Sequence, residues 1–229
     1  MLHHSLKKSF FLLIALAGVS VSAQKDLKLR YKQPAVEWTE ALPVGNGTLG
    51  AMVFGRVEAE LIQLNEATLW SGGPVHKNVN PDAFKNLVLI REALKNEDFE
   101  KANVLTKNMQ GPYTESFMPL GDLILKQDFG GQKAASYDRS LDIQTGLAVT
   151  SFNAGGVNYK REIFASAPAQ CIVIKLSADQ LKKLSVTIDA ASLLKNQKAV
   201  QNQTLVLKGK APSHADPNYI DYNKEPVIY

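Results

Sequence analysis

Cysteine, histidine and tryptophan are scarce in this chain of 229 residues. It has one cysteine, four histidines and two tryptophans. The single cysteine, Cys171, excludes an internal disulfide framework, and its apolar surroundings at 171–174 predict a buried, small hydrophobic residue. The few histidines form no ligand-spaced cluster with cysteines or carboxylates. We therefore predict no metal site and no cofactor.

Long hydrophobic runs are also missing, except near the start of the chain. Residues 1–23 combine Lys7 and Lys8, an apolar core at 10–19, and a small-residue cleavage site that ends at Ala23. This arrangement predicts a secretory signal peptide at 1–23, followed by a mature chain at 24–229. The apolar core is too short for a transmembrane helix, although an uncleaved anchor is the alternative. We expect export to the periplasm or the extracellular space, and no membrane as a partner.

A strong excess of one charge is absent as well. The formal net charge is +4, and it falls to +2 when the two lysines of residues 1–23 are removed, because that segment holds no acids. No long basic run stands out. This balance argues against nucleic acid as a partner.

The most informative stretch is the glycine-rich segment 41–74. Asn46-Gly47 lies there between the apolar runs 42–44 and 49–53. An Asn-Gly pair in this position predicts a β-hairpin with a type I′ turn, which needs φ > 0 at both central residues. The segment ends in a dense group of turn residues at 71–74, directly after Trp70.

The glycines of this stretch also match nucleotide-binding patterns. Gly45-x-Gly47-x-x-Gly50 fits the dinucleotide fingerprint, but the residues that follow predict a strand and not the helix that would hold the phosphates. Asp128-Phe129-Gly130 spells a protein-kinase motif, yet the chain has no His-Arg-Asp. The glycines are better explained by hairpin geometry.

One region predicts helices. Asn80 can cap a first helix that begins at Pro81, and Asp98 can cap a second that ends before Gly111-Pro112. We expect this helical pair to be an insertion that covers a face or an edge of a sheet.

The rest of the chain reads as short strands with tight turns. Apolar and polar residues alternate at 141–145, 146–153 and 157–165, and Ala154-Gly155-Gly156 is predicted to join the last two as a hairpin. Many short strands and little helix predict a mainly β fold, an antiparallel β-sandwich with a short helical insertion. We predict one domain at 24–229.

Several separated motifs together resemble one enzyme family. They are ALPVGNGTLGAMVFG (41–55), LNEATLWSGGP (64–74), PLGDL (119–123), YKREIFASAPAQ (159–170) and GKAPSHADPNY (209–219). In this order they are similar to the N-terminal domain of glycoside hydrolase family 95. The family consists of bacterial α-L-fucosidases with some α-L-galactosidases.

The resemblance implies a larger enzyme than the chain itself. It implies a large sandwich, incomplete here, and an (α/α)₆ barrel whose carboxylates act in an inverting mechanism on fucosylated glycans. No barrel motif occurs in the chain, so no catalytic residue can be assigned. The chain is therefore expected to be inactive alone and to support the barrel. We also expect the sequence to continue, because 227–229 resembles the start of a strand with an unpaired edge.

Three residues are candidates for a substrate or domain contact: Trp70, Glu66 and Trp38. Trp70 is expected at the end of a strand, where an indole suits a domain interface or a sugar-lined cleft. Trp38 lies between Glu37 and Glu40 and could stack on a sugar, although a half-buried structural aromatic has the same pattern. A stand-alone carbohydrate-binding module is the alternative function.

The acids beside the motifs do not identify a catalytic pair. They are Glu37, Glu40, Glu66, Asp122 and Asp216. Ser213, His214 and Asp216 have the residue types of a catalytic triad, but triads are recognised by geometry, and such close spacing instead favours a turn.

Overall fold

The computed structural model describes residues 27–73, 80–110, 115–219 and 225–229. The predicted signal peptide at 1–23, Pro74 and Gly111-Pro112 lie outside the described residues. In the part that is described, no helix is long and apolar enough to cross a membrane.

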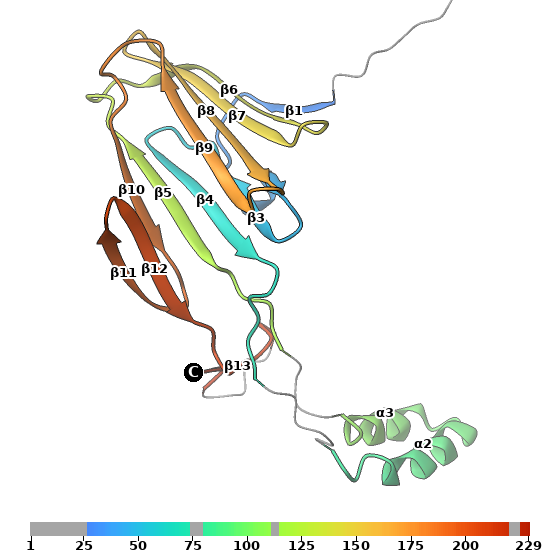
Figure 1. Ribbon diagram of the computed structural model, residues 1–229. Helices are drawn as coiled ribbons and strands as arrows, with labels where there is room; N and C mark the ends of the chain where they lie inside the picture. Colours follow the sequence, from blue (N-terminus) through green and yellow to red (C-terminus); the bar gives the residue numbers. More distant parts are fainter. Residues whose placement is uncertain (1–26, 74–79, 111–114, 220–224) are drawn as a thin grey trace, which may run out of the picture.

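Two five-stranded antiparallel sheets form the body of the molecule, as Figure 1 shows. The first sheet has the order β1-β6-β7-β8-β9, with β1 Lys28–Tyr31, β6 Ala134–Asp142, β7 Leu147–Ala154, β8 Val157–Ser166 and β9 Cys171–Ala178. The second has the order β10-β5-β4-β3-β2, with β10 Val186–Ala191, β5 Gly121–Gln127, β4 Ala59–Glu66, β3 Leu49–Val53 and β2 Leu42–Gly45. The predicted antiparallel β-sandwich is confirmed.

The main core lies between the two sheets. It contains Leu42, Val53, Ile62 and Leu125 from the second sheet and Ile163 from the first, all nearly inaccessible to solvent. These positions follow the period of two that places alternate side chains on one face of a strand. Cys171, predicted to be buried, is only partly buried; it begins β9, which lies at the edge of the first sheet.

The β2–β3 hairpin is confirmed, but its predicted type I′ turn is wrong. Gly47 has a positive φ of 92°, whereas Asn46 does not. The side-chain Oδ1 of Asn46 instead accepts hydrogen bonds from the N–H groups of Thr48 (3.0 Å) and Leu49 (2.7 Å). Its Nδ2 donates to the carbonyl of Ser166 at 3.0 Å, which ties the hairpin tip to the other sheet. The turn is centred on Gly47-Thr48 and not on Asn46-Gly47, because the N–H of Asn46 donates to the carbonyl of Leu49 at 3.1 Å and closes the loop there.

The predicted hairpin between β7 and β8 is confirmed. Gly155 and Gly156 both have positive φ, 59° and 79°, and they join β7 to β8 as a two-residue loop. Asp128 forms a local turn in which its Oδ1 accepts from the N–H of Gly130 at 2.8 Å. The nucleotide patterns therefore lie in hairpin and turn geometry.

The helical pair forms a helical arm, residues 80–110, made of α2 Lys85–Lys95 and α3 Phe99–Lys107. Asp98 caps α3 as predicted, since its Oδ1 accepts from the N–H of Lys101 at 3.1 Å. The first helix begins at Lys85 and not at Pro81, because residues 81–84 form turns such as that from the N–H of Ala83 to the carbonyl of Asn80. The Nδ2 of Asn80 donates to the carbonyls of Asn108 and Gln110.

The expected position of the helical arm is wrong. Figure 1 shows α2 and α3 standing away from both sheets, packed on each other. The arm therefore does not cover the sandwich in the way its amphipathic pattern suggested.

The end of the chain also differs from expectation. β14 Val227–Ile228 pairs with β13 His214–Ala215 and does not present a wholly unpaired edge. A separate hairpin, β11 Lys195–Gln201 with β12 Thr204–Lys210, lies beside β10. Strand β11 is exposed throughout and mostly polar, with the sequence KNQKAVQ, so it has no alternation of apolar residues that would have predicted a strand.

Candidate functional site

Trp70 lies where three distant parts of the chain meet. It forms an isolated antiparallel bridge with Phe117, and the Ser71 N–H donates to the carbonyl of Ser116 at 2.8 Å. The Gly72 N–H reaches the carbonyl of Pro212 at 3.0 Å. We call this meeting of residues 70–72, 115–117 and 212–216 the three-segment junction.

Serine side chains hold the three-segment junction together. The buried Ser71 hydroxyl accepts from the N–H of Ser116 at 2.9 Å, and the Ser116 hydroxyl donates to the carbonyl of Ala215 at 2.9 Å. Three of the motifs noted in the sequence, or residues beside them, are thereby brought together. The serine bonds connect the three segments, which do not share one sheet.

The aromatic side chains of the junction face solvent. Trp70 is 49% exposed and Phe117 43% exposed, and their rings pack edge-to-face with centroids 5.3 Å apart. The indole N–H of Trp70 already donates to the carbonyl of Ala67 at 3.0 Å. What the pair offers to a ligand or a neighbouring domain is thus apolar ring surface and not a free donor.

Glu66, the second candidate, is engaged locally. Its Oε2 accepts from the N–H and the hydroxyl of Thr68, at 2.9 and 2.6 Å. These bonds shape the turn that leads from β4 to Trp70. The structure therefore places Glu66 and Trp70 in one segment, and it gives Glu66 a structural hydrogen-bonding role there.

Trp38, the third candidate, lies at the other end of the sheet. It belongs to the short 3₁₀ helix η1 Trp38–Glu40, just before β2, and is 56% exposed. Strands β2 and β4 are both antiparallel to β3, so the start of β2 and the end of β4 lie at opposite ends. The two tryptophans do not form one sugar-stacking platform.

The carboxylates beside Trp38 stabilise the helix η1. Glu40 accepts from the N–H groups of Val36 and Glu37 at 2.8 and 3.3 Å, and these bonds hold the pKa of Glu40 below its usual value. Asp122 lies opposite Gln63 in the β4–β5 ladder. The acids singled out in the sequence are thus dispersed along the sandwich.

The triad arrangement of Ser213, His214 and Asp216 is partly formed. The Nε2 of His214 lies 2.8 Å from the Oδ1 of Asp216. The Ser213 hydroxyl instead donates to the carbonyl of Ile228 at 3.1 Å, within the β13–β14 pairing. The serine therefore serves the strand pairing. His214 and Ala215 lie in strand β13 and not in the turn that the close spacing suggested.

The sequence reasoning missed a buried polar cluster between the sheets. The Arg161 guanidinium donates to Oε2 of Glu60 at 2.8 Å and to Oε1 of Gln127, and both charged side chains are almost fully buried. Arg161 also reaches the carbonyls of Arg56 and Val57. The alternation of side chains along the strands was the signal that could have revealed this cluster. Arg161 lies at one of the inward-facing positions of β8, and Glu60 at one of those of β4.

The hydrogen bonds of the cluster favour an ion pair, whereas burial opposes it and lowers the pKa of the Arg161 guanidinium. Burial raises the pKa of the Glu60 carboxyl, while the charge of Arg161 and the N–H of Gly55 act in the opposite direction. Both Glu60 oxygens accept from donors, Arg161 and Gly55, so the ionised carboxylate fits its surroundings. Burial and the Glu60 charge raise the pKa of Tyr137, whose hydroxyl donates to the carbonyl of Gly55. This cluster fastens the two sheets to each other.

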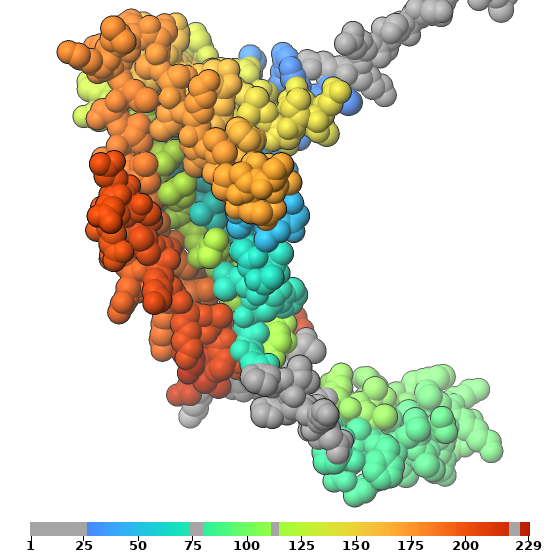
Figure 2. Space-filling view, viewed as in Figure 1, coloured from blue at the N-terminus to red at the C-terminus, as the bar shows by residue number. Residues whose placement is uncertain are grey.

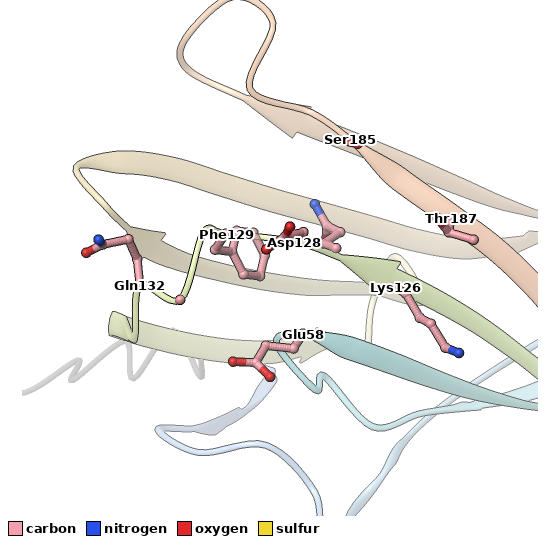
Figure 3. Close-up of a pocket in the computed structure, with 9 residues that line it drawn as sticks. Glu58, Lys126, Asp128, Phe129, Gln132, Ser185 and Thr187 are labelled. Carbon is pink, nitrogen blue, oxygen red and sulfur yellow. The ribbon is translucent and has the colours of Figure 1, made fainter.

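One cavity in the described residues has a volume of about 390 Å³ and lies at the β5–β6 turn. Its lining includes Glu58, Lys126, Asp128, Phe129, Gln132, Ser185 and Thr187. Figure 3 shows Lys126 and Gln132 on opposite sides of this space. Its size and polar lining suit a small hydroxylated ligand, but none of the three candidate residues contributes to it.

The described residues contain no candidate metal site. There, no three His, Cys, Asp or Glu side chains come together as a metal-binding group.

Most of this chain is similar in sequence to known proteins. The chain is 35% identical to α-L-fucosidase 2 of Arabidopsis thaliana over 172 residues, which is 74% of the chain and 20% of that protein. It is 32% identical to probable α-fucosidase A of Aspergillus oryzae over 169 residues, 69% of the chain and 23% of that protein. The chain thus spans about a fifth of the length of these relatives.

A family model matches almost the entire described sandwich. It is the model for the N-terminal domain of glycosyl hydrolase family 65, and it covers residues 29–225. This range includes both sheets, the three-segment junction and the helical arm. The chain therefore belongs to the family of glycosyl hydrolase family 65 N-terminal domains.

Proposed function

We propose that this chain is the N-terminal domain of an exported glycoside hydrolase, an α-L-fucosidase of family 95 that acts on fucosylated glycans. The observation that carries the proposal is the sequence similarity to proteins named α-fucosidases, in each of which the match covers about a fifth of the length. The pattern of residues 1–23 supports export. An α-L-galactosidase relative is the variant of this proposal.

In this proposal the sandwich is structural, and the catalytic (α/α)₆ barrel lies in the remainder of the longer polypeptide. The geometry supports this division. Glu66 and Glu40 are held by hydrogen bonds to neighbouring residues, and they lie at opposite ends of the sheet. An inverting glycosidase instead needs two carboxylates that face each other across the sugar with room for water.

The test compares two proteins on 2′-fucosyllactose and on a p-nitrophenyl fucoside. One is the 229-residue chain, and the other is the polypeptide extended to the length of the relatives. We expect turnover only by the extended polypeptide. Comparable turnover by the 229-residue chain would show that the catalytic groups lie within it.

A second candidate, a carbohydrate-binding module, is favoured by the 390 Å³ cavity at the β5–β6 turn. Its carboxylates, hydroxyls and amide can bond sugar hydroxyls, and Phe129 adds an apolar wall. Calorimetry of the 229-residue chain with fucose, galactose and fucosylated oligosaccharides tests this function. Heat that is lost in Glu58→Gln and retained in Trp38→Ala would support the cavity, while no heat at millimolar sugar would eliminate it.

A further inference from the structure

The helical arm exposes more large apolar side chains than its size explains. Phe84, Val88 and Phe99 are 68%, 69% and 66% exposed, and Val104 is 58% exposed. Phe84, Leu87 and Val88 are spaced so that they share one face of α2. Single exposed apolar residues are ordinary, but a group on one small element marks a contact surface.

The arm is also short of partners for its own stability. Helix α2 has 11 residues and α3 has 9, and isolated helices shorter than about 12–15 residues are marginal in water. Their shared interface buries only Ile90, Ala93 and Ala102. Neither sheet covers the remaining apolar surface, and Figure 2 shows the arm as a separate green body. A partner that covers this apolar surface would stabilise the arm.

The surface of the arm has a defined shape. Asp98 caps α3, and Glu97 adopts a left-handed conformation, φ 57°, in the turn between the helices. Asn80 bridges to the carbonyls of Asn108 and Gln110 at the base of the arm. A preformed helical hairpin of this kind loses less conformational entropy when it docks.

We propose that the apolar face of the helical arm, Phe84, Leu87 and Val88 with Phe99, docks onto a neighbouring domain of the same longer polypeptide. The inference rests on the proposed function, which supplies that domain. The arm lies within the matched range 29–225, and the relatives carry about four-fifths of their length outside the match.

Two other partners fit less well. A stable interface between two copies uses about 20–30 residues a side, and the arm offers a handful of exposed apolar side chains. Within one polypeptide a small patch is sufficient, because linkage gives an effective concentration in the millimolar range. Basic and acidic residues are mixed along both helices, so the arm lacks the one-signed charge that nucleic acid or an anionic membrane would attract.

Four lysines on or at the ends of the two helices make the docking testable. They are Lys85, Lys95, Lys101 and Lys107. The longer polypeptide is treated with an amine-reactive cross-linker and analysed by mass spectrometry, with isotope-mixed copies to identify links between molecules. We expect links from these lysines to residues beyond 229. Three results would overturn the inference: arm lysines that link only to the sandwich, arm lysines that link only to another copy, or arm lysines with no link outside the arm.

A pair of substitutions gives the second readout. Phe84→Ser with Val88→Ser removes two of the four side chains of the apolar face. Serine is favourable at the N-cap position that Phe84 occupies, so α2 is not weakened there. The matched control is Leu181→Ser with Leu193→Ser, at residues 95% and 92% exposed in loops. We expect the arm variant to lower the unfolding midpoint of the longer polypeptide by several degrees and to leave that of the 229-residue chain unchanged.

The control variant should change neither midpoint. Equal midpoints for arm variant and control in the longer polypeptide would overturn the inference. The proposed function is judged separately, by turnover of fucosides. An active longer polypeptide without arm cross-links would leave the proposed function intact and eliminate only the docking.

Discussion

Arg161 and Glu60 place a complete ion pair between the two sheets. Both side chains are almost fully buried, and Gln127 and two backbone carbonyls complete the coordination of the guanidinium. In the described residues no buried side-chain nitrogen or oxygen lacks a hydrogen-bond partner. The cost of desolvating the charges is therefore offset by several bonds, and the loss of one member leaves the other without compensation.

Arg161→Met is expected to lower the free energy of unfolding by about 3–5 kcal/mol, because it leaves the Glu60 charge buried and unpaired. Glu60→Gln combined with Arg161→Met should lose less than the sum of the two single variants, since the double variant removes both charges. Denaturant unfolding of all four proteins measures the coupling. Strict additivity would contradict the ion-pair description.

Glu40 gives the fold a contribution that depends on pH. Its pKa is lowered, first by the hydrogen bond from Val36 and then by that from Glu37. A carboxyl with a lowered folded-state pKa contributes stability above its ordinary value of 4.5, and this stability is lost as the pH falls through the lowered pKa.

Glu40→Gln should therefore be less stable than the wild type at neutral pH. The difference in the free energy of unfolding should shrink below about pH 4, where the wild-type carboxyl itself becomes protonated in the unfolded chain. Unfolding midpoints between acidic and neutral pH measure this. A difference that stays constant over the range would show that the carboxylate charge is irrelevant.

Among the elements, the β2–β3 hairpin shows how one side chain links two sheets. Asn46 accepts two backbone hydrogen bonds within the loop and donates one to Ser166 at the end of β8. The hairpin is thus held by local geometry and by one contact across the sandwich.

Asn46→Ala is expected to lower the free energy of unfolding by about 1–3 kcal/mol, because it removes three hydrogen bonds that contribute modestly each. Asn46→Asp is the matched control, since it keeps both acceptor contacts and loses only the donation to Ser166. Chemical denaturation should rank the wild type first, the aspartate variant second and the alanine variant last. Equal losses in the two variants would assign the whole effect to the contact with Ser166.

For the whole molecule, the three-segment junction is the surface whose role depends on the rest of the polypeptide. Trp70 is half exposed in the described chain, and its ring contacts Phe117. A half-exposed aromatic contributes only part of its apolar area to the sandwich itself. The remaining area is available to a neighbouring domain.

Trp70→Ala should consequently have a small effect on the unfolding midpoint of the 229-residue chain and a larger one in the longer polypeptide. If the junction buries the ring against a second domain, the loss there approaches about 3–5 kcal/mol. Melting temperatures are measured together with kcat and KM on 2′-fucosyllactose. An unchanged melting temperature with a large rise in KM would instead assign Trp70 to a substrate cleft.

The sequence by itself determined most of the strands, the β7–β8 turn and the cap of the second helix. The strand predicted at 141–145 is wrong, because β6 ends at Asp142 and residues 143–146 form the turn to β7. Gly155-Gly156 forms the predicted two-residue loop, and Asp98 caps α3, because both signals act through the backbone of a few adjacent residues. Alternation along β8 likewise predicted an inward face. These features depend on local dihedral preferences, which a short stretch of sequence encodes.

Only the tertiary structure decided which faces find partners. Glu60 and Arg161 are 101 residues apart, and their pairing depends on how the two sheets lie on each other. The loop at Asn46 does not form the predicted turn type, and the Asn46 side chain donates to the carbonyl of Ser166, 120 residues away. The helical arm has a local pattern that fits a sheet face, yet the sheets cover their cores with each other. Local propensity specifies an element, whereas burial is settled by long-range packing, because the hydrophobic effect is not directional.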